Sequence, residues 1–124
     1  MLILHVGYAF VPLGFLAIGA AVFFPGAIPM SAALHAWTAG AIGVMTLAVM
    51  SRATLGHVGK PLHATRGAVF VYLCAIMATV LRIATGLGLT PQALLYLAAA
   101  SWIAAFAGFA VLYGPLLMRP RQTH

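Results

Sequence analysis

The chain alternates long apolar runs with short segments that contain glycine, proline or basic residues. The first run covers 23 residues without a charged side chain, which is roughly 34 Å of helix and enough to cross a bilayer. Three further runs have similar lengths, so the pattern predicts spans at about 2–24, 32–52, 66–86 and 91–117. The expected fold is all-α: a single domain, residues 1–124, with four transmembrane helices in an antiparallel bundle.

Residues that favour turns and caps mark the expected span ends. Pro12 predicts a kink near the middle of the first span. Ser31 suits the N-cap of the second span, and Thr90 followed by Pro91 suits the start of the fourth. The segment 52–66 combines glycine, proline and basic residues, so we expect a loop there.

Small residues recur along the expected second and fourth spans, which predicts close helix packing. In the second span they are Ala36, Ala39, Gly40 and Gly43. In the fourth span they are Ala98, Ser101, Ala105 and Gly108. In the third span Arg82 shares a face with Ala68, Val71, Ala75, Ala78 and Thr79.

The composition places the whole chain in a lipid bilayer. Hydrophobic residues make up 65% and charged residues 5%, and Asp and Glu are absent. The formal charge of +6 is concentrated in connections, which argues against a nucleic-acid partner. Without side-chain carboxylates the chain cannot build a Ser-His-Asp triad or a carboxylate pair. The single Cys74 lies within an apolar run and is expected to pack as a small hydrophobe.

Basic residues in the connections predict the orientation of the bundle. Arg52, Lys60 and Arg66 lie between the second and third spans, and Arg119 and Arg121 follow the fourth. The other two connections contain no Lys or Arg. By the positive-inside rule both basic segments, and with them the N- and C-termini, are expected in the cytoplasm.

A polar stripe on the second span contains the first candidate binding residues. At 100° per residue one face carries His35, Thr38, Ile42, Met45, Val49 and Arg52. His35 is a candidate axial ligand for haem or copper, or a residue that hydrogen-bonds a neighbouring helix. Met45 is a candidate soft second ligand or a packing residue. Arg52 either faces a ligand or anchors the helix at the membrane surface.

Helix direction separates the polar residues by depth. His35 and Arg82 should share the outer leaflet, whereas His5, Arg52 and His57 should lie toward the cytoplasm. A guanidinium inside a bilayer costs at least about 2.5 kcal/mol. Arg82 therefore needs a backbone carbonyl, a lipid phosphate, another subunit or an anionic ligand such as a haem propionate, unless it extends to the headgroups.

The central segment HAWTAGAIGVMTLAVMSRATLGHVGKPL closely resembles the NnrS family, and HVGYAFVPLGF and YGPLLMRPR resemble its flanking segments. The resemblance implies a bacterial inner-membrane, multi-pass protein of denitrification and the nitric oxide or nitrosative-stress response that binds haem and copper. The matching positions are His5, His35, Arg52, Thr54, Gly56, His57 and Arg82. The resemblance makes three of these residues, His5, His35 and His57, the candidate metal ligands.

The resemblance covers the C-terminal third of family members, which have more spans, and so implies a split or truncated form. We therefore expect an oligomer or a second membrane subunit as partner, together with lipid and nitric oxide. The alternative is a cofactor-free subunit or scaffold that packs its small-residue stripes against a larger membrane protein. A small transporter fits least well, since the spans lack acidic residues. Catalytic activity is left open.

Overall fold

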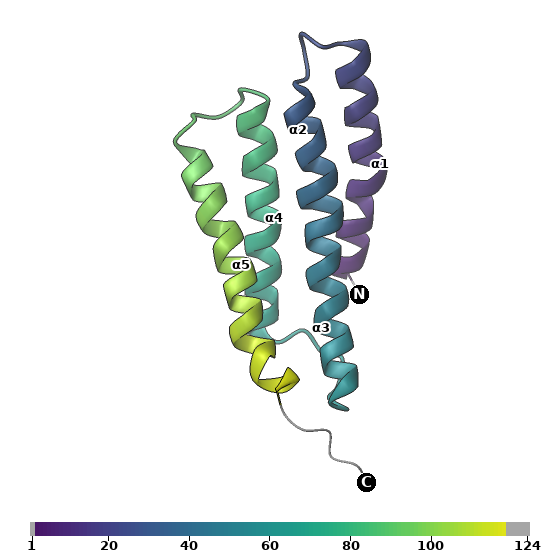
Figure 1. The fold of residues 1–124 in the computed structure, drawn as a ribbon, viewed down its shortest axis with the longest axis vertical. Helices are drawn as coiled ribbons and strands as arrows, with labels where there is room; N and C mark the ends of the chain where they lie inside the picture. Colours follow the sequence, from purple (N-terminus) through teal and green to yellow (C-terminus); the bar gives the residue numbers. More distant parts are fainter. Residues whose placement is uncertain (1, 119–124) are drawn as a thin grey trace.

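The computed structural model describes residues 2–118, which form helices without strands (Figure 1). Four helical segments are long and apolar enough to cross a membrane, as the hydropathy pattern predicts. The second is one continuous segment, Met30–His57, built from three consecutive parts. The elements are α1 (Leu2–Phe23), α2 (Met30–His35), the π-helical segment η1 (Ala36–Val44), α3 (Met45–His57), α4 (Arg66–Gly86) and α5 (Leu94–Leu117).

The four spans lie side by side in the order of the sequence, and each runs opposite to the one before it (Figure 1). Close contacts at glycines fix the register. Gly7 meets Met45 of the second span, and Gly14 meets Trp37. Farther along, Gly86 of α4 meets Ala32. We call the end of the bundle with the loop 58–65 the basic end, and the end with the turns 24–29 and 87–93 the short-turn end.

Small residues let the helices approach closely, as the stripe on the fourth span predicts. Ala75 and Ala105 are fully buried between α4 and α5, with Val71 and Phe109 in the same cluster. Cys74 packs against this cluster as a small apolar side chain. Large apolar side chains on the outer surface are exposed, which suits contact with lipid tails.

The second span extends farther toward the basic end than expected. The predicted loop starts at residue 52, but α3 continues to His57. The hydroxyl groups near this end are satisfied within the helix, because each bonds a backbone carbonyl one turn earlier: Ser51 donates to Leu47 at 2.6 Å and Thr54 to Met50 at 2.8 Å. The prediction of a loop over 52–57 is therefore wrong, and the connection comprises only 58–65.

Two predicted helix starts are also wrong. The second span begins at Met30 after Pro29, so Ser31 lies within the first turn and does not cap it. The fourth span begins at Leu94, after a turn in which the carbonyl of Pro91 accepts from the Leu94 amide at 3.0 Å. Thr90 bonds the hydroxyl of Thr85 at 2.8 Å instead of capping α5.

Candidate functional site

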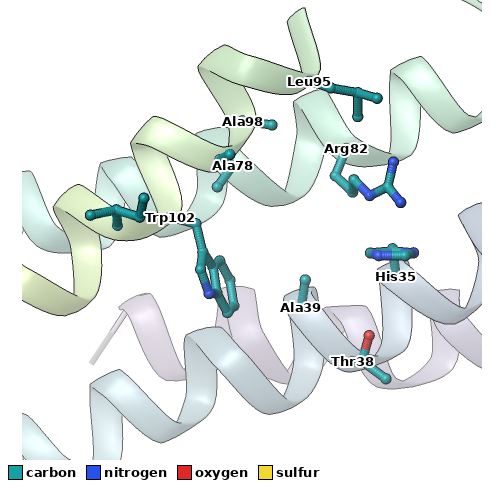
Figure 2. A pocket seen from close by; sticks show the side chains of 10 residues that line it. His35, Thr38, Ala39, Ala78, Arg82, Leu95, Ala98 and Trp102 are labelled. Atoms are coloured by element: carbon teal, nitrogen blue, oxygen red, sulfur yellow. The ribbon is translucent and has the colours of Figure 1, made fainter. Parts of the chain in front are cut away.

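A cavity of about 650 Å³ lies between the second span, α4 and α5, in the half of the bundle nearer the short-turn end. Its size is in the range of cofactor and small-molecule sites. Figure 2 shows side chains from all three spans around it. The lining residues are His35, Thr38, Ala39, Ala78, Arg82, Leu95, Ala98, Ala99, Trp102 and Ile103.

His35 stands where α2 passes into η1, and its ring orientation is fixed by the backbone. Its Nδ1 lies 2.6 Å from the carbonyl oxygen of Ser31. A carbonyl oxygen can only accept, so Nδ1 must carry the hydrogen. In the neutral imidazole this leaves the lone pair on Nε2, the atom through which such a histidine can bind a metal.

Arg82 faces His35 across the cavity, as the antiparallel topology predicts (Figure 2). The contact of Gly86 with Ala32 sets these two helices in this register. Within residues 2–118 the structure gives the guanidinium no hydrogen-bond or ion-pair partner, and the sequence contains no Asp or Glu. A permanent positive charge thus stands at the wall of a mainly apolar cavity.

Trp102 forms the deep part of the cavity wall and was not a candidate from the sequence. Its ring lies against that of Phe106 in a tilted arrangement, with 4.8 Å between the ring centroids, and it reaches across to Gly43 of η1. A Cβ on Gly43 would stand only 2.5 Å from its Cη2 atom. Glycine at position 43 was the available sequence signal for a close contact, but only the packing of α5 on the second span shows that the neighbouring ring is that of Trp102.

The π-helical segment divides the stripe predicted on the second span between two sides. Its looser winding, with i→i+5 hydrogen bonds, changes the angle between residues that precede and follow it. His35 and Thr38 line the cavity, whereas Ile42 and Met45 line a separate apolar hollow with Val11 of α1. Met45 packs against Gly7 of α1 and does not line the cavity with His35.

A second polar cluster lies toward the basic end and includes Arg52. The hydroxyl of Tyr72 forms hydrogen bonds with the hydroxyls of Ser51 and Tyr113, and it interacts electrostatically with the guanidinium of Arg52. Ser51 and Tyr113 are buried, so these hydroxyls join α3, α4 and α5 inside the bundle. Hence Arg52 belongs to a different site from His35, as the depth argument predicts.

The other predicted metal ligands lie apart from the cavity. His5 is exposed on α1, and His57 is exposed at the end of α3. Across residues 2–118 no group of three or more His, Cys, Asp or Glu side chains is placed to hold a metal ion. The ligand roles of His5, His57, Arg52 and Met45 stay predictions.

Comparison with protein families matches the family described as NnrS protein over residues 1–121. The matched region contains all four spans and both polar sites. No curated protein and no solved structure matches the chain. The resemblance found in the sequence is therefore confirmed over nearly the whole chain.

Proposed function

Because this chain belongs to the NnrS family, we propose that it is an integral membrane protein of the nitric oxide and nitrosative-stress response that binds haem in the His35–Arg82 cavity. The observation that carries the haem assignment is the hydrogen bond from His35 Nδ1 to the Ser31 carbonyl, which leaves the lone pair of Nε2 available to bind a metal. Ligating histidines usually have such a bond on the other ring nitrogen, because it fixes the ring and strengthens the donor.

The donor set of the cavity suits haem better than copper. Haem iron is held by the nitrogens of its macrocycle and takes only axial ligands from the protein, so one imidazole suffices. A protein copper site needs several histidine, cysteine or methionine ligands. The cavity is lined by one histidine and by no cysteine or methionine. Copper in this cavity would therefore need further ligands from outside it.

Each cavity residue has a role in this proposal. His35 would hold the haem iron through Nε2, and the Ser31 carbonyl would keep the ring in place. Arg82 would balance negative charge on the cofactor, and the small apolar wall around Ala98 would exclude water. A bound haem iron supplies a coordination position for nitric oxide. The apolar lining suits this ligand, which is small and uncharged and dissolves in the bilayer.

The proposed location is the bacterial inner membrane, with the basic end in the cytoplasm. Four apolar spans and basic residues confined to one end among residues 2–118, apart from Arg82, support it. We propose a second copy or a larger membrane subunit as partner.

The test is the absorption spectrum of the protein purified in detergent, with metal analysis of the same sample. We expect a Soret band that shifts when nitric oxide is added. His35→Ala should abolish the band without reducing membrane insertion, and His63→Ala, in the exposed basic loop, should leave it unchanged. A purified chain that contains no haem would contradict the proposal. Its recovery only with a larger membrane protein would then favour the cofactor-free subunit.

A further inference from the structure

We infer that the cavity binds an amphipathic anion whose carboxylate or phosphate pairs with Arg82. The inference rests on the proposed function in using the same cavity, and it adds the chemical group that the ligand must carry. It follows from three independent observations: the charge balance of the chain, the position of the guanidinium, and the distribution of polar residues around the cavity.

The charge balance requires a partner from outside the chain. Arg82 lies within a span, about one helical turn from the end of α4 at Gly86. The guanidinium carries a permanent positive charge. The sequence offers no Asp or Glu, and the structure of residues 2–118 gives the group no carbonyl acceptor. An oxyanion is the partner that fits its planar set of donors best.

The position of the guanidinium places that partner inside the cavity. Arg82 is only partly exposed, and its side chain is turned toward His35 across the cavity (Figure 2). His35 and the guanidinium of Arg82 therefore line the same cavity from two different spans. A ligand can contact both groups at once.

The distribution of residues predicts the shape of the ligand. His35 and Arg82 stand together at one end of the cavity, and Trp102 stands at the other, with Ala78 and Ala98 between (Figure 2). The charged end is the one nearer the short-turn end of the bundle. The matching ligand has an apolar body that lies against the alanines and the indole, and an anionic group directed toward the membrane surface.

Two sources supply this chemistry: the propionates of haem and the phosphate of a phospholipid. The first experiment compares haem with its propionate dimethyl ester, titrated into the apo-protein in detergent. The wild-type protein should bind haem at least about tenfold more tightly than the ester, the value for one charge-assisted hydrogen bond. In Arg82→Gln this preference should fall to about twofold or less, and Arg82→Lys should restore part of it. Arg66→Gln, which removes an exposed cation at the basic end, is the matched control and should keep the preference.

The second experiment tests the lipid source by native mass spectrometry of the protein with phosphatidylglycerol. If the phosphate is the partner, the wild-type protein and Arg66→Gln retain the lipid, Arg82→Gln loses it, and haem and its ester bind alike. Equal binding of haem and ester together with equal lipid retention in all variants would overturn the inference. If the protein binds no haem at all, the proposed function fails and the lipid measurement alone decides the inference.

Discussion

Substitution of Gly43 by alanine tests the contact that closes the cavity at its deep end. The added methyl group would stand 2.5 Å from Cη2 of Trp102, whereas carbon atoms pack at about 3.5 Å or more. The indole ring must therefore move by about 1 Å. It is rigid and packed on Phe106, so either the ring turns into the cavity or α5 moves away from η1. Overpacking of this kind typically costs about 1–3 kcal/mol.

The matched control is Gly19→Ala, because a Cβ at Gly19 meets nothing within 4 Å. Alanine is the better helix former by about 0.5–1 kcal/mol, so this variant should be neutral or slightly more stable. Unfolding by dodecyl sulfate, followed by circular dichroism, measures the difference. In a Trp37→Phe background Trp102 is the only tryptophan, and its emission reports the ring movement directly. Gly43→Ala should also weaken haem binding, since the ring enters the cavity. Equal stability of the two variants, with unchanged haem affinity and Trp102 emission, would refute the close approach of α5 to η1.

Two further predictions concern the basic end. Tyr72→Phe removes a hydroxyl that is hydrogen-bonded to buried Ser51 and Tyr113, so it should lower the free energy of unfolding by about 1 kcal/mol. The Soret band should stay unchanged. A shifted band would show that this cluster affects the cavity. Gly59→Ala places a side chain at a φ of 66° and should cost about 1–2 kcal/mol, whereas Gly56→Ala, with open space around its Cβ, should not. Equal unfolding midpoints for these two variants would show that the turn at Gly59 is not left-handed.

The fold was predictable because membrane-spanning helices can be recognised in a sequence by their length and hydropathy. The position of His35 and Arg82 at the same depth also followed from the sequence, because the direction of each antiparallel span fixes how deep each of its residues lies in the membrane. Neither conclusion needs knowledge of side-chain packing. The sequence pattern thus located the more important half of the candidate site.

The errors arose where the backbone departs from the regular pattern. An α-helical period placed Met45 on the face of His35, but the π-helical segment between them turns Met45 toward α1. No single residue type predicts a π-helical segment. The end of α3 was missed because Arg52 and Gly56 read as a loop, while Ser51 and Thr54 satisfied their hydroxyls within the helix. Trp102 was missed because the neighbour of Gly43 depends on tertiary packing.

The bond between His35 and the Ser31 carbonyl also connects the cavity with the short-turn end of the bundle. The His35 ring is bonded to the first turn of a six-residue helix that starts directly after Pro29. Because a ligand that moves the imidazole would strain this bond, we expect a spectroscopic label in the connection 24–29 to respond when the cavity is filled.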